Sequence, residues 1–98
     1  MDKSSFLNKQ QILAMRAQAH HLHPVVMVGQ KGLTEAVVRE TDTALRAHEL
    51  IKVRVLGDDR EERSEIAAAL CAEVGAQLVQ HIGKLLVLYR KKEEEGQD

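Results

Sequence analysis

The chain has 98 residues, of which 44% are hydrophobic, with a formal net charge of −1 and a single cysteine, Cys71. The length favours one domain with a modest core, the small charge argues against a general polyanion binder, and a lone cysteine excludes an internal disulfide. No apolar run approaches the ~18 residues of a membrane span, and the first residues do not resemble a secretory signal. The sequence therefore predicts a cytoplasmic, single-domain protein without a membrane partner.

Charge is distributed unevenly along the chain. Residues 1–34 hold four basic residues and one acidic residue, whereas residues 57–98 hold six basic and ten acidic residues. A cationic end and an anionic end on one small domain predict an oriented, local binding site. Only Phe6 and Tyr89 are aromatic, which argues against a platform of aromatic rings for stacking bases.

The first element is expected to be a helix over residues 5–22. Two stripes follow its period: an apolar one of Ile12, Met15, Ala19 and Leu22, and a polar one of Lys9, Arg16, His20 and His23. Pro24 is expected to end this helix, since the residue before a proline disfavours the α region. Residues 25–28, Val-Val-Met-Val, predict a strand that is apolar on both faces and therefore central in its sheet.

The link after this strand is the most informative part of the chain. Gly29 and Gly32 bracket Gln30 and Lys31, and a helix start at Thr34 follows. Glycines leave room for close approach of a ligand backbone, and a helix N-terminus with a nearby lysine suits phosphate. The spacing matches neither a phosphate loop of nucleotide hydrolases nor a dinucleotide fingerprint. It is typical either of a tight connection or of the Gly-x-x-Gly loops that clamp nucleic acid.

The rest of the chain predicts two more helices and three more strands. A helix from Thr34 to Glu49 has an inner face of Val37, Thr41, Ala44, Leu45 and His48, and residues 50–56 form a strand with Lys52 and Arg54 on one side. Residues 57–59 cap a third helix that ends at Gly75 and buries Cys71. Strands over residues 76–82 and 84–90 form a hairpin at Gly83. The domain spans residues 1–90, and the charged tail over residues 91–98 is expected to be disordered.

These segments resemble the YhbY family of stand-alone CRM domains (chloroplast RNA splicing and ribosome maturation). The matching stretches are residues 19–22 (AHHL), 24–26 (PVV), 28–29 (VG), 32–35 (GLTE), 49–53 (ELIKV), 82–84 (IGK) and 88–90 (LYR). The resemblance implies an α+β two-layer fold with a four-stranded mixed sheet, similar to KH domains and to the C-terminal domain of initiation factor 3. It also implies binding of ribosomal RNA in precursors of the large ribosomal subunit. Lysine often follows the first glycine in the family, whereas Gln30 stands there in this chain and Lys31 comes next.

The residues expected to contact RNA follow from the loop, the polar stripe and the family. They are Gly29, Gln30, Lys31, Gly32, Arg16, Lys9, His20, Lys52, Arg54 and Lys84. Lys52 and Arg54 are equally compatible with a role as charged gatekeepers of a sheet edge.

Other functions find less support in the residues. His20, His21 and His23 lack a carboxylate or cysteine that would complete a metal site, and a helix-end cap is the better interpretation for at least one of them. No catalytic motif is recognisable, so the sequence predicts no enzyme, no cofactor and no small-molecule substrate, but a monomeric RNA-binding module. The alternative is an adaptor that binds other proteins of the assembly or stress machinery through its apolar and acidic surfaces.

Overall fold

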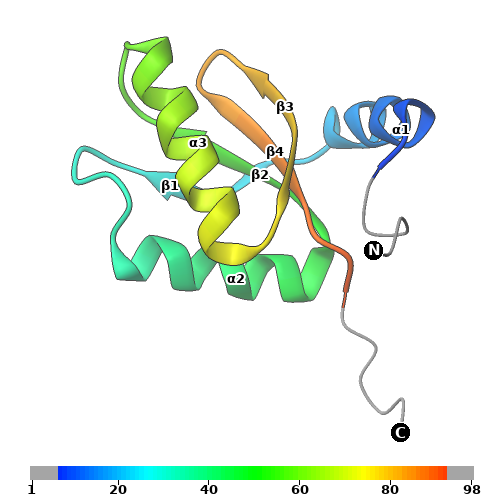
Figure 1. Ribbon diagram of the computed structural model, residues 1–98, viewed down its shortest axis with the longest axis horizontal. Helices are drawn as coiled ribbons and strands as arrows, with labels where there is room; N and C mark the ends of the chain where they lie inside the picture. The colour runs from blue at the N-terminus through cyan, green and yellow to red at the C-terminus, as the bar shows by residue number, and fades with distance from the viewer. Residues whose placement is uncertain (1–6, 93–98) are drawn as a thin grey trace, which may run out of the picture.

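The computed structural model describes residues 7–92 and folds them into three helices and one four-stranded mixed sheet (Figure 1). The elements are α1 (Lys9–Ala19), β1 (Pro24–Val28), α2 (Glu35–His48), β2 (Leu50–Val55), α3 (Arg60–Val74), β3 (Gln77–Ile82) and β4 (Leu85–Tyr89). The predicted α+β class and the predicted order of elements are confirmed. Most of the charged tail, from residue 93 on, lies outside the described residues. Within residues 7–92, no helix has the length and apolarity needed to cross a membrane.

The strands lie in the order β1-β2-β4-β3. β1 runs parallel to β2, while β4 is antiparallel to both of its neighbours. Because β1 and β2 are parallel and joined by α2, their carboxyl ends meet at one edge of the sheet, where the 29–34 loop begins. The prediction that β1 is central was wrong. It is an edge strand, and Val25 and Met27 are 54% and 56% exposed, because α1, the helix on that side of the sheet, packs over β2 and β3.

The two faces of the sheet are covered unequally. α2 and α3 pack on one face, and their apolar residues form the main core with residues such as Ile51, Val53, Val55, Leu86 and Leu88. α1 packs on the opposite side, here called the outer face, where its apolar stripe forms a smaller core with Val79 and Val87. The predicted apolar stripe of α1 and the predicted inner face of α2 are therefore confirmed. The exception is His48, which is exposed and does not belong to the inner face of α2.

Capping residues set the helix boundaries. α1 begins at Lys9, because Asn8 forms a reciprocal capping box with Gln11. Residues 5 and 6 of the predicted helix lie outside the described residues. It ends at Ala19, with His20 as the C-cap residue, so Pro24 does not terminate the helix but opens β1. The third helix follows the prediction: Asp59 caps its start, and Gly75 ends it in the left-handed region at φ 67°.

Cys71 is half-buried against the main core, as predicted for a small apolar side chain. Burial raises the pKa of its thiol to about 11, so the side chain is a neutral thiol near pH 7.

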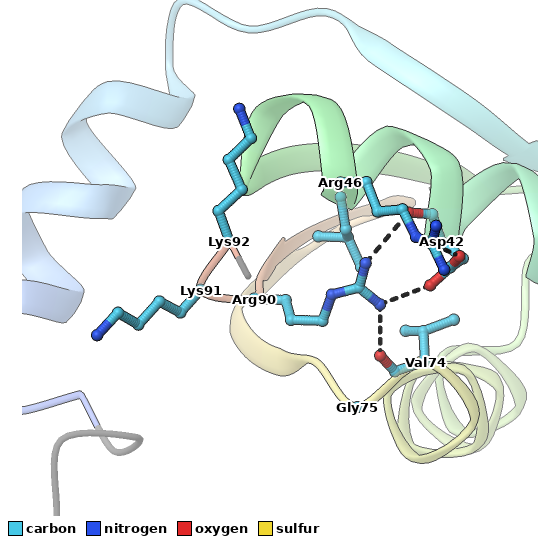
Figure 2. A pocket seen from close by; sticks show the side chains of 8 residues that line it. Asp42, Arg46, Val74, Gly75, Arg90, Lys91 and Lys92 are labelled. Atoms are coloured by element: carbon cyan, nitrogen blue, oxygen red, sulfur yellow. Dashed lines mark hydrogen bonds and ion pairs between the residues drawn. The ribbon is translucent and has the colours of Figure 1, made fainter. Parts of the chain in front are cut away.

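Arg90, directly after β4, connects α2 with the end of α3 (Figure 2). From the end of β4, its Nη1 donates to Asp42 Oδ1 on α2 at 2.7 Å and to the Val74 carbonyl at the end of α3 at 2.8 Å. Its Nη2 donates to the Asp42 carbonyl at 3.2 Å. The hydrogen bond from Arg90 lowers the pKa of Asp42 below 3.8, although partial burial opposes this shift. Arg90 therefore holds the layer together and is not an available cation.

Asp42→Asn is expected to lower the free energy of unfolding by about 1–2 kcal/mol at pH 7, because it removes the charge from the hydrogen bond to Arg90. Since the pKa of Asp42 is depressed in the folded state, its contribution is present above about pH 4 and is lost as the pH falls through the folded pKa. Urea titrations of both proteins should therefore differ at pH 7 and converge near pH 2.

Arg46→Gln is the matched control, because Arg46 also pairs with Asp42, at 3.1 Å, but its side chain is 75% exposed. It should cost less than about 0.5 kcal/mol. Equal losses for the two variants would contradict the assignment of the stabilising contact to Arg90.

Candidate nucleic-acid interface

The Gly-x-x-Gly segment forms a tight turn at the carboxyl end of β1. The Gly32 amide donates to the Gly29 carbonyl at 3.0 Å, which places Gln30 and Lys31 at the exposed tip. Gly32 has φ +73°, which favours glycine, whereas Gly29 does not have a positive φ. Within residues 7–92, the amides of Gln30 and Lys31 have no hydrogen-bond partner. The tip therefore offers two backbone donors and one ammonium group to an anion.

The start of α2 contributes less to this site than the sequence suggested. Thr34 Oγ1 accepts from the Val37 amide at 3.2 Å, and Glu35 places a carboxylate in the first helical turn. These groups already satisfy part of the helix terminus and its dipole. The donors that suit an anion here are the turn amides and not the helix end.

Lys52 and Arg54 project from the outer face of β2. This strand pairs with β1 on one side and β4 on the other, so the interpretation as edge gatekeepers was wrong. Arg54 is exposed, and neither side chain has a hydrogen bond or ion pair within the described part of the chain. Arg54 lies beside Met27, two residues before Gly29, and therefore close to the edge that carries the loop.

The structure does not place α1 beside the glycine loop. The loop lies at the left of Figure 1 and α1 at the right, where α1 packs against β2 and β3. Part of the Arg16 guanidinium group already has a partner, because its Nε donates to the Val79 carbonyl at 3.1 Å and attaches α1 to β3. Lys9 and His20 are exposed, at the start and the end of the helix.

The outer face nevertheless connects the two ends. His21 and His23, which follow α1, line a hollow of about 470 Å³ together with Lys52 and Val25. From the loop, the cations thus continue over Arg54 and Lys52 to the end of α1. Among residues 7–92, no group of histidine, cysteine and carboxylate side chains has a metal-binding arrangement.

Lys84 lies in the β3–β4 turn at the same edge as the loop. Its ammonium group pairs with Asp58 at 3.3 Å, and its carbonyl accepts from the Val55 amide at 2.8 Å. Both side chains of the pair are well exposed, so the pair is weak and Lys84 can exchange it for another anion.

Arg63 is a residue of this edge that sequence reasoning missed. It stands in an acidic stretch and reads as a solvated charge, but it is only 8% exposed. Its Nη1 donates to the Gly57 carbonyl at 2.7 Å, while its Nε is buried without a partner in the described structure. Burial lowers the pKa of the nearby His81 ring, and Arg60 and Arg63 lower it further, whereas a hydrogen bond to the Gly83 carbonyl raises it. Arg63 therefore positions the β2–α3 link beside the loop.

Acidic side chains are distributed unevenly over the elements of the described structure. All carboxylates in residues 7–92 lie on α2, on α3 or in the short links at their ends; α1, the four strands and the glycine loop contain none. These carboxylate-free segments contain five of the six predicted cations, namely Lys9, Arg16, Lys31, Lys52 and Arg54. The sixth, Lys84, lies in the β3–β4 turn and pairs with Asp58. The net charge of −1 thus conceals two faces of opposite sign.

The fold and these charges define a class: a small α+β domain with an acidic helical layer and a basic outer face. The chain belongs to the CRS1 / YhbY (CRM) domain family, whose model matches residues 7–90. The resemblance noted in the sequence is confirmed.

Several relatives are named for binding RNA. An RNA-binding protein of Haemophilus influenzae is 51% identical over 88 residues, which cover 90% of this chain and 89% of that protein. A probable RNA-binding protein of Bacillus subtilis is 41% identical over 83 residues, covering 85% and 86% of the two chains. The solution structure of a Staphylococcus aureus protein, described as a candidate RNA-binding protein, aligns with a TM-score of 0.81 at 33% identity, over 92% of this chain and 94% of that one.

Gly29→Ala and Gly32→Ala are expected to differ in stability. Neither added methyl group would meet an atom within 4 Å, but Gly32 has a positive φ and Gly29 does not. Gly32→Ala should therefore lower the free energy of unfolding by about 1 kcal/mol, and Gly29→Ala should leave it nearly unchanged. Thermal unfolding of the two variants checks this, and a loss of similar size for Gly29→Ala would contradict the turn geometry.

Proposed function

We propose that this chain is a non-catalytic, cytoplasmic RNA-binding protein that binds ribosomal RNA in precursors of the large ribosomal subunit. The observation that supports it most strongly is the absence of carboxylates from α1, the four strands and the glycine loop within residues 7–92, which leaves a basic outer face with Asp58 at its edge. Phosphate contacts dominate the affinity of proteins for nucleic acids, and nearby carboxylates would oppose them. The names of the relatives support RNA as the ligand. The ribosomal target rests on the family resemblance.

In this proposal the glycine turn meets the RNA backbone. The free amides of Gln30 and Lys31 and the Lys31 ammonium group would contact phosphates, with Arg54 and Lys52 continuing the track over β2. Gly29 has open space around its α-carbon, so it permits close approach of a sugar–phosphate chain. Such contacts position an RNA without reading its sequence, so selectivity for particular bases should be low.

The groove between α2 and α3 suits RNA poorly. It is lined by Glu35, Asp42 and Glu73, against the single cation Arg39. This acidic groove is the feature that favours the second candidate function, an adaptor for a protein partner.

Lys31→Glu combined with Arg54→Glu is expected to weaken binding of an unstructured RNA by more than about tenfold at 0.1 M salt, because two phosphate contacts become repulsive. Wild-type affinity should fall with salt at a slope of about −0.7 per contacted phosphate, and the variant should show a shallower slope. Fluorescence anisotropy with a labelled oligonucleotide measures both. Arg16 is left unchanged, because its hydrogen bond to Val79 couples it to the fold.

Arg39→Glu is the matched control for charge. Arg39 is exposed on α2, on the acidic side, so its reversal should change RNA affinity by less than about twofold. If wild-type affinity is insensitive to salt, or if Arg39→Glu weakens binding as much as the reversals on the outer face, the proposed interface is wrong. A wild-type protein that does not bind RNA would favour the adaptor.

Crosslinking in living cells, followed by sequencing of the attached RNA, tests the ribosomal target. Reads should concentrate on large-subunit ribosomal RNA, and the Lys31→Glu, Arg54→Glu variant should reduce them while Arg39→Glu does not. Reads scattered over many RNAs would refute the ribosomal assignment and leave general RNA binding in place.

A further inference from the structure

One half of the outer face remains uncovered, and its side chains form a single row across the sheet. Met27 of β1 pairs with Arg54 of β2, Arg54 pairs with Leu85 of β4, and Leu85 pairs with Ile82 of β3. Directly paired residues point to the same face. The row therefore consists of three apolar side chains around one guanidinium group, and it spans all four strands.

α1 covers the other half of the same face and leaves this row open. The neighbouring rows contain Val87 and Tyr89, which pack with α1 in the smaller core, but Leu85 is not part of that cluster. Met27 and Ile82 are 56% and 54% exposed, and they are among the few large apolar side chains so exposed in the described chain. This apolar exposure lies at the edge that also carries the glycine loop.

We infer that this row, Met27–Arg54–Leu85–Ile82, is a platform for unpaired bases and that the ligand of the outer face is single-stranded RNA. The inference rests on the proposed RNA binding and adds the class of RNA and the residues that contact its bases. None of the three apolar residues was among the residues expected to contact RNA.

Charge complementarity selects this occupant. The strands bear no carboxylate, and Arg54 has no partner among residues 7–92. Lys31 and Lys84 lie at the edge of the row, where Lys84 forms an exposed ion pair with Asp58. A nucleobase has an apolar face and is attached to an anionic backbone, so apolar side chains framed by cations match both parts. A guanidinium plane also stacks on bases, which compensates for the scarcity of aromatic side chains.

The geometry favours unpaired RNA over a duplex. In an A-form helix the base faces are stacked and inaccessible, so a duplex could use the cations but not Met27, Leu85 or Ile82. Strand spacing makes the row about 14 Å wide, and a four-stranded sheet accommodates two or three splayed bases. Bases laid on this face would have their phosphates directed toward the cationic loop edge.

The test compares a labelled unstructured RNA with a hairpin duplex on the full chain. Met27→Ser combined with Ile82→Ser is expected to weaken binding of the unstructured RNA by about tenfold, because base contacts are lost. Duplex affinity and the salt slope should stay unchanged, since no cation is removed. Leu13→Ser is the matched control: Leu13 is 53% exposed but lies on α1, away from the row, and its loss should not affect either RNA.

Methyl NMR of the wild-type protein gives an independent measurement. Adding the unstructured RNA should shift the methyl signals of Met27 and Ile82 by ring currents, and leave those of Leu13 unshifted. If wild-type RNA binding is salt-dependent but the serine variant keeps full affinity and the Met27 and Ile82 signals do not move, the platform is refuted while the proposed function stands. An equal loss on both RNAs also refutes it. A wild-type protein that binds neither RNA refutes both proposals.

Discussion

Two faces of one sheet have to be shielded by only three helices, and the rest of the structure follows from how they are divided. α2 and α3, with 14 and 15 residues, cover one face together. The outer face receives only α1, whose 11 residues make a rod of roughly 16 Å. It packs over the Val79 and Val87 half and cannot also cover the half beside the glycine loop. The exposed apolar residues of β1 and β3 are thus a consequence of coverage, and they lie where the cations of the outer face converge.

Six of the basic residues form two groups that differ in what their side chains bind. Arg16, Arg63 and Arg90 each donate to a backbone carbonyl where an element ends or a helix docks. A guanidinium group, with several donors in a rigid plane, suits such positions better than an ammonium group does. Lys31, Lys52 and Arg54 have no such bond in the described part of the chain. Removing a residue of the first group would disturb the fold, so only the second group reports cleanly on binding.

Local patterns in the sequence were sufficient to predict the helices and strands, but not to predict which strands lie side by side in the sheet. Helix stripes, the Asp59 and Gly75 caps and the hairpin at Gly83 are properties of short segments, and the structure follows them. Strand order depends on pairing between distant residues, so the apolar Val25–Val28 run was misread as central when it is an edge. For the same reason the sequence did not reveal which arginines donate to backbone carbonyls, because the carbonyl that Arg16 binds lies 63 residues away along the chain. The sequence showed a charge difference between the two ends of the chain. In the folded protein this difference lies mainly between the two faces of the sheet.

This arrangement explains how a chain with a net charge of −1 can present a surface suited to a polyanion. Carboxylates on α2 and α3 are separated from the outer face by the sheet and the width of a helix, on the order of 15 Å. The Debye length at physiological salt is about 8 Å, so these charges are largely screened at the outer face, whereas the contacts of Lys31 or Arg54 are not. An RNA that approaches the α2–α3 side meets the carboxylates directly. Net charge therefore predicts little here. In the proposed interface, the separation of charge would favour one orientation, with the open half of the sheet toward the RNA.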